Sequence, residues 1–185
     1  MKTIYTLTLI FIIITVLISI IMLLYSEAKK RICSLYEKLN NIENKYIEKY
    51  NNKFELVTKF INGIEDKYKI ENKTFNNVKA LEGNLEVNQK NEKLLNKCYK
   101  ELKEIKEEKQ KIKELKLFRK IIDDYEENEL ALISLRTYYN SHTLIFNSLI
   151  KKFPYNIISK FKKFSTKNLI EGKEIDLDFN NDLEV

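Results

Sequence analysis

An unbroken apolar run opens the chain. Residues 4–25 form 22 consecutive positions without a charged residue, Gly or Pro. As an α-helix this run would be about 33 Å long, enough to cross the roughly 30 Å hydrocarbon core of a bilayer. A cleaved signal peptide has a shorter apolar region and small residues at its cleavage site, whereas this run ends in LLYSEAKKRIC. We therefore expect residues 1–25 to be a retained membrane anchor that contacts the lipid bilayer through residues 4–25.

Beyond this anchor, apolar side chains recur at intervals of three and four, the spacing of one face of an α-helix. The first such stripe comprises Ile32, Leu35, Leu39, Ile42, Tyr46, Tyr50, Phe54, Val57, Ile61, Ile64 and Tyr68, and Phe75, Val78 and Leu81 continue it. Gly83 is the best early break, because glycine tolerates the conformation that ends helices. The pattern predicts one very long helix that ends near this glycine.

A second stripe has a spacing close to 3.5 residues. It comprises Leu95, Cys98, Leu102, Ile105 and Ile112, with Lys and Glu between them. This spacing is also that of a coiled-coil seam. Because no Gly or Pro marks the end of the stripe, its helix has no clear end, and we expect the chain to turn between Glu107 and Glu114.

The last helical stripe consists of Tyr139, Thr143, Phe146, Ile150 and Phe153. Pro154 should stop or kink the helix at Phe153. Asn140 and Asn147 lie beside the stripe, one position further along the chain. The two asparagines could form a polar binding pair, or they could hydrogen-bond across a helix interface and fix its register. We favour the second interpretation.

Composition agrees with a helical protein. Only three glycines and one proline occur in the chain, whereas a sheet protein usually marks its many turns with these residues. The net charge of +6 is small beside 33 basic and 27 acidic residues. Mixed charges of this kind indicate solvated helix faces rather than the basic stripe of a nucleic-acid binder. Cys33 and Cys98 have no CxxC partner, which argues against a metal site or a disulfide framework.

The charges that flank the apolar run predict its orientation. Lys29, Lys30 and Arg31 follow the run, whereas Lys2 is the only charged side chain before it. Because cytoplasmic flanks carry an excess of Lys and Arg, the rest of the chain is expected on the cytoplasmic side of the cell membrane, after a single pass.

The stretch LRTYYNSHTLIFNSLIKKFP resembles the C-terminal signature of the LemA family of bacterial membrane-anchored proteins. That signature has Arg, then Tyr-Asn, an aromatic-Asn pair seven residues later, Ile, and Phe-Pro. The matching positions here are Arg136, Tyr139, Asn140, Phe146, Asn147, Ile150, Phe153 and Pro154. The family spacing continues upstream and downstream at Phe118, Ile121, Tyr125, Asn128, Glu129, Phe164 and Glu171. In the loops the chain is divergent, with Lys109-Gln110 in place of the usual Tyr-Pro and Lys163 in place of a Gly.

The resemblance implies an all-α protein in which a single membrane helix carries an antiparallel, up-and-down four-helix bundle. On this basis we expect the bundle over residues 26–164 and an acidic, flexible tail over residues 165–185. What the resemblance implies is architecture and a membrane location rather than a mechanism.

No constellation of catalytic residues is recognisable in the sequence. His142 is the only histidine, no nucleophile is recognisable beside it, and no Gly-rich loop precedes a helix. We therefore expect no catalytic, cofactor-binding or metal-ligating residue and no small-molecule substrate. The favoured function is a protein-interaction or scaffolding module whose partner is an unidentified protein or a second copy of the chain. The alternative is an elongated coiled-coil spacer that oligomerises through the seam of residues 95–112.

A basic segment follows the signature. Residues 151–167 contain six lysines and no acidic residue, and Ile157, Ile158, Phe161 and Phe164 are expected to share a helix face. Such a face could lie on anionic lipid or cap the bundle core. In a simple up-and-down arrangement the third long helix runs parallel to the first and ends away from the membrane, so capping is the favoured interpretation.

Overall fold

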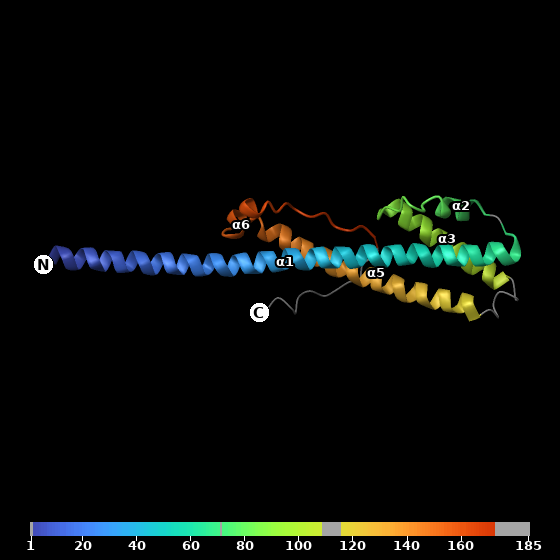
Figure 1. Ribbon diagram of the computed structural model, residues 1–185, viewed down its shortest axis with the longest axis horizontal. Helices are drawn as coiled ribbons and strands as arrows, with labels where there is room; N and C mark the ends of the chain where they lie inside the picture. Colours follow the sequence, from blue (N-terminus) through green and yellow to red (C-terminus); the bar gives the residue numbers. More distant parts are fainter. Residues whose placement is uncertain (1, 71, 109–115, 173–185) are drawn as a thin grey trace. The chain divides into compact units, whose positions relative to one another are not determined.

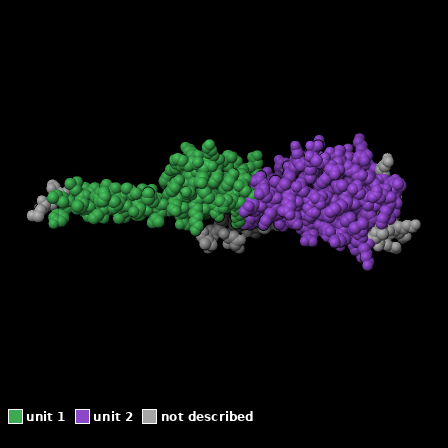
Figure 2. All heavy atoms as spheres, in the orientation of Figure 1, with its two compact units in different colours: residues 1–40, 141–168 green, residues 41–140, 169–185 purple. Residues whose placement is uncertain are grey.

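The structure, a computed structural model, describes residues 2–70, 72–108 and 116–172. The described part is helical and contains no strand, which confirms the expected all-α fold (Figure 1). Its helices are α1 (Lys2–Tyr68), α2 (Lys73–Lys79), α3 (Gln89–Glu108), α5 (Lys116–Leu149) and α6 (Tyr155–Lys162). The chain divides into two compact units, one formed by residues 1–40 and 141–168 and the other by residues 41–140 and 169–185 (Figure 2).

Helix α1 joins the apolar run to the first stripe without a break. It is 67 residues long, and its stripe is buried largely as expected, at Ile32, Leu39, Ile42, Tyr46, Tyr50, Val57, Ile61 and Ile64. The expected end at Gly83 is wrong, because α1 ends at Tyr68. Lys69 has a φ of 51°, in the left-handed region, and Asn72 starts α2 by accepting a hydrogen bond from the Thr74 amide. A short polar cap therefore interrupts an apolar pattern that continues past it.

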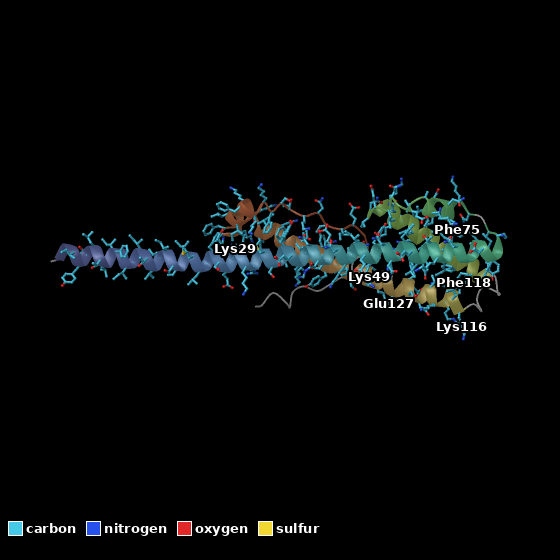
Figure 3. All side chains as sticks on the ribbon, in the orientation of Figure 1. Lys29, Lys49, Phe75, Lys116, Phe118 and Glu127 are labelled. Carbon is cyan, nitrogen blue, oxygen red and sulfur yellow. The ribbon has the colours of Figure 1, made fainter. Side chains whose placement is uncertain are left out.

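The core of the second unit is built from α1, α2, α3 and α5. Its fully buried residues include Phe60, Phe75, Leu95, Cys98 and Phe118. Gly63 lies where α1 meets α5, and a Cβ atom added there would be 2.9 Å from the Phe118 ring. Glycine at this position therefore permits the close packing of the two helices. Figure 3 shows Phe75 and Phe118 among the side chains of this unit.

Contacts in this unit establish the direction of each helix. Phe60 meets Phe118, and Tyr46 meets Arg136, so α5 runs antiparallel to α1. Arg136 also binds Glu92, whereas Tyr125 stacks on Tyr99, so α3 is antiparallel to α5. The expectation that the last long helix runs parallel to the first is therefore wrong. Helix α2 and residues 80–88 return the chain before α3 begins, and this additional pass reverses the expected directions of α3 and α5.

The second stripe serves the core of its own chain. Leu95, Cys98 and Leu102 are fully buried in the cluster formed with α1 and α5. The alternative in which they form an oligomerising seam is therefore wrong for these three residues. Ile105 packs against the cluster and is partly buried. Ile112 and most of the expected turn lie outside the described residues, between the end of α3 at Glu108 and the start of α5 at Lys116.

Helix α5 ends earlier than Pro154 predicted. Its last residue is Leu149, after which the Lys151 and Lys152 amides bond to carbonyls three residues back and tighten the chain into turns. Phe153 is 77% exposed, so its assignment to the buried stripe is wrong. Periodicity overextended the stripe because the chain changes direction within these turns.

Candidate functional site

Arg136 forms the centre of a buried polar cluster in the second unit. Its side chain is 1% exposed. The Nη2 atom donates to the hydroxyl of Tyr46 at 2.6 Å and to Oε1 of Glu92 at 2.7 Å. Because these partners come from α1 and α3, a single arginine on α5 connects three helices.

The electrostatics of this cluster keep the arginine charged. Burial acts to lower the pKa of Arg136, but the hydrogen bond to Tyr46 and the attraction of Glu92 outweigh it and raise the pKa above its usual value. Burial raises the pKa of Tyr46, although Arg136 opposes the shift. At neutral pH the cluster is therefore a guanidinium that donates to a neutral phenol and to Glu92.

The C-terminal segment covers the same arginine. Gly172 has a φ of 136°, and a Cβ atom added to it would lie 2.4 Å from the Arg136 guanidinium. Both the backbone conformation and the close approach require glycine. Asn140, one turn along α5, holds this segment to the helix. Its Nδ2 donates to the Ile170 carbonyl at 2.8 Å, and its Oδ1 accepts from the Ile170 amide at 2.8 Å.

A second ion pair lies near the middle of the unit. Lys53 is 1% exposed, and its Nζ lies 2.6 Å from Oε2 of Glu129. The neighbouring Asn128 donates through Nδ2 to the Lys49 carbonyl at 2.9 Å and accepts from Asn52 at 3.3 Å. These contacts tie α5 to α1. Figure 3 labels Lys49 on α1 and Glu127 on α5, on the same part of the unit.

In the first unit, Asn147 binds main chain in the same way as Asn140. Its Nδ2 donates to the Lys167 carbonyl at 2.8 Å, and its Oδ1 accepts from the Lys167 amide at 2.9 Å. The expectation of a bond across a helix interface is therefore wrong for Asn147, and the hydrogen bonds of Asn140 to Ile170 likewise hold one residue of the segment after α6. The spacing of the asparagines matches the spacing of their partners. Asn140 and Asn147 are separated by seven residues of helix, which rise about 10.5 Å, and Lys167 and Ile170 by three residues, which span about 10 Å as extended chain.

The remaining signature residues have different environments. Tyr139 is 3% exposed, and Phe146 is fully buried. The Phe146 ring lies 5.8 Å from that of Tyr36 and 6.0 Å from that of Phe164. Ile150 is half-buried, and Pro154 precedes α6. The signature thus supplies core residues, main-chain clamps and exposed positions rather than one convergent site.

The sequence profile of the LemA family matches residues 38–179. The chain belongs to the LemA family. Neither a curated protein nor a solved structure matches it in the corresponding comparisons.

The apolar run precedes the residues matched to the LemA family. Within the described residues, α1 is the one helix that is long and apolar enough to cross a membrane, and its apolar window is not buried. This arrangement is consistent with a single membrane anchor in front of the LemA domain.

Sequence reasoning overlooked several polar residues of the LemA domain. Glu92 and Lys53 belong to buried ion pairs, yet in the sequence they resemble the many surface Glu and Lys residues of charged helices. Nothing in a single sequence distinguishes a buried charge from a solvated one on the same kind of helix. The arginine at position 136 was identified only through the family signature.

The expected absence of a metal site concerns acidic, His and Cys side chains. In the described part of this LemA chain, no three such residues are arranged to hold a metal ion. His142 lies in the first unit, with Nε2 3.4 Å from Lys38 Nζ and Nδ1 3.4 Å from Ser141 Oγ. Both contacts are long for hydrogen bonds.

Proposed function

We propose that this LemA family protein is a non-enzymatic, membrane-anchored interaction module whose helical bundle binds a protein partner at the inner face of the bacterial membrane. The observation that carries the proposal is that the Arg136 guanidinium is enclosed by other residues of the same chain. Tyr46, Glu92 and the Gly172 segment occupy the space around the guanidinium. A buried charge engaged in this way specifies how the helices pack, which is the requirement of a scaffold.

A shallow groove between α1 and α5 supports this function. The groove has a volume of about 460 Å³ and is lined by Lys45, Glu48, Lys49, Ala131, Ser134 and Leu135. On α5, Leu130 precedes the lining residue Ala131, and its side chain is 66% exposed. Apolar positions with a charged rim are typical of protein-binding surfaces. The groove between two helices suits an amphipathic helix of the partner, with basic and acidic side chains opposite the mixed charges of α1.

The partner can be tested by placing a photo-crosslinking amino acid at Leu130 in intact cells. We expect a discrete crosslinked species from this position. A crosslinker at Lys100, which is exposed on α3 with an 80% exposed side chain, should produce none and is the matched control. Leu130→Asp, combined with a crosslinker at Ser134, should abolish the adduct without changing the melting temperature. Equal labelling from Lys100, or an adduct that survives Leu130→Asp, would contradict the assignment of the groove.

The proposed orientation depends on Lys29, Lys30 and Arg31, which are exposed on α1 directly after the apolar run. Protease added to intact cells should leave the bundle uncleaved, and the same protease should digest it after lysis. Cleavage before lysis would place the bundle on the outer face.

The non-enzymatic character of the protein has a separate test at His142. We expect His142→Ala to preserve both the melting temperature and the Leu130 adduct, because the imidazole is partly exposed and lies outside the groove. A loss of biological function in this variant, with stability and partner binding intact, would favour an enzyme instead.

A further inference from the structure

The segment around α6, residues 150–164, packs against the end of the apolar run in the first unit. Both line a hollow of about 360 Å³. From α1 it is lined by Ile21, Leu24, Tyr25, Glu27 and Ala28, and from the α6 segment by Phe153, Pro154, Tyr155 and Ile157. This placement follows from the antiparallel course of α5 and differs from the position expected for a cap at the far end of the bundle.

The apolar run determines the level of the α6 segment in a membrane. A span of residues 4–25 is about 33 Å long, against a hydrocarbon core of roughly 30 Å, so its ends lie near the two headgroup layers. Ile21, Leu24 and Tyr25 belong to the last turns of that span. The residues that face them across the hollow therefore lie at the headgroup level on the carboxyl side of the anchor.

The α6 segment exposes large apolar side chains, of which Phe153 and Ile157 also line the hollow. Phe153 is 77% exposed, Ile157 40% and Phe161 79%. Ile158 is buried, and Phe164 lies beyond the helix, where its ring stacks on that of Tyr36. The residues expected to share one face are thus divided into two groups. Ile158 and Phe164 hold the segment within the first unit, whereas Ile157 and Phe161 are exposed.

Positive charge accompanies these apolar side chains. Residues 130–170 contain no Asp or Glu. Five lysines of the α6 segment, Lys151, Lys152, Lys160, Lys162 and Lys163, are exposed. On α1, the cations at positions 29–31 follow the residues that line the hollow, and Figure 3 labels Lys29 on this part of the helix. Aromatic side chains among lysines are the combination found on helices that lie in an anionic membrane surface.

We propose that the α6 segment is a second membrane contact, in which Phe153, Ile157 and Phe161 enter the headgroup region of the bilayer that α1 crosses and the surrounding lysines bind anionic lipid headgroups. Lysines outnumber acidic residues on this surface, where Glu27 is the one acidic residue that lines the hollow, and a predominantly basic surface beside a membrane span matches lipid phosphates better than a protein partner with charges of both signs. This contact would hold the first unit against the membrane and make its position sensitive to lipid composition.

The segment is ordered before it meets lipid. The Phe164 and Tyr36 rings stack with centroids 4.4 Å apart at 19°, and Asn147 holds the main chain of Lys167. Both contacts fix the residues that follow α6. Since the helix is already formed, membrane binding does not have to supply the free energy of folding it.

The chain contains no tryptophan, so Phe161→Trp introduces a unique fluorescent reporter. We would reconstitute the full-length variant in vesicles of phosphatidylcholine with a phosphatidylglycerol fraction and include brominated phosphatidylcholine as a quencher that acts within the bilayer. We expect strong quenching and a blue-shifted emission. Leu130→Trp, at an exposed position in the second unit, is the matched control and should be quenched weakly.

The charge contribution is tested by adding Lys160→Glu and Lys162→Glu to the Phe161→Trp variant. Each lysine lost should weaken the attraction to anionic lipid about fivefold, so quenching should fall and should no longer respond to phosphatidylglycerol. Circular dichroism of each variant would verify that the helices remain folded. Quenching of Phe161→Trp no stronger than that of Leu130→Trp would overturn the proposal. The proposal would also be overturned if an aqueous quencher reached the tryptophan at position 161 in vesicles and only a bound protein shielded it.

Discussion

At the scale of single residues, Arg136 connects helices whose sequences give little sign of the connection. Because the guanidinium is buried and donates to both Tyr46 and Glu92, removing it leaves the carboxylate of Glu92, whose side chain is only 12% exposed, without this partner. We expect Arg136→Met to lower the free energy of unfolding by about 3–5 kcal/mol. Urea unfolding in detergent, followed by circular dichroism, would measure the loss.

Arg119→Met is the matched control, since Arg119 is an exposed arginine on the same helix. Its effect should stay within about 0.5 kcal/mol of zero. Similar losses for the two variants would show that the Arg136 cluster does not stabilise the bundle.

Cys98 makes the free energy of unfolding depend on pH in the alkaline range. Burial, with a smaller contribution from Glu101, raises the pKa of this thiol from its usual value near 9 to about 12. Between these values the unfolded chain has released the proton while the folded chain retains it. Stability is therefore fully present below pH 9 and falls as pH rises, by up to about 1.4 kcal/mol per pH unit.

Cys98→Val keeps an apolar side chain of similar size and removes the titration. Unfolding free energies measured between pH 9 and 10, just above the thiol's usual pKa, should fall less steeply for this variant than for the native chain. Parallel curves would show that the thiol titrates alike in both states.

At the scale of elements, the last signature helix contains two phenylalanines with opposite roles. Phe146 is fully buried beside Tyr36 and Phe164, whereas Phe153 lies beyond the end of α5 and is 77% exposed. We expect Phe146→Ala to cost about 3–5 kcal/mol, because it leaves a cavity. Phe153→Ala should change stability by less than about 0.5 kcal/mol. Thermal melting in detergent separates the two, and equal midpoints would contradict the burial of Phe146.

The segment after α6 is also held by α5, through the asparagine clamps. In Asn147→Asp, the carboxylate still accepts from the Lys167 amide but can no longer donate to the Lys167 carbonyl. Losing this hydrogen bond should raise the hydrogen-exchange rate of the Lys167 amide about tenfold. Ser148→Ala, at the adjacent exposed position, should leave the rate unchanged. Equal rates in both variants would mean that the clamp does not hold the segment.

At the scale of the whole molecule, the apolar run and the bundle are separable. Among the residues whose side chains the structure describes, the first buried one is Ala28. The cores of both units therefore consist of residues beyond position 25. We expect a variant that lacks residues 1–25 to be soluble and mainly helical. Circular dichroism would measure its helical content. A spectrum dominated by disorder would contradict the prediction that the bundle folds without lipid.

Local properties of the chain determined its helical class, its apolar run and most of its core positions. Ile61, Leu95 and Leu102 repeat at helical spacing whatever the tertiary arrangement, so periodicity located them correctly. The family signature added the position of Arg136 and included the two asparagines already noted beside the last stripe, because a signature records residue identity at fixed spacing. It could not supply their partners, which lie on other helices or beyond α6.

Only the tertiary structure decided the direction of the helices and the partners of the charged residues. Helix α1 ends at Tyr68 within a continuing apolar pattern, Asn72 starts α2, and the additional pass this creates makes α5 antiparallel to α1. That direction brings Phe153 and Pro154 to the last turns of the apolar run. Periodicity could not reveal this, because it records which face of a helix is apolar but not the direction in which the next helix runs. Glu92 was equally hidden, since burial of a charge depends on what packs over it.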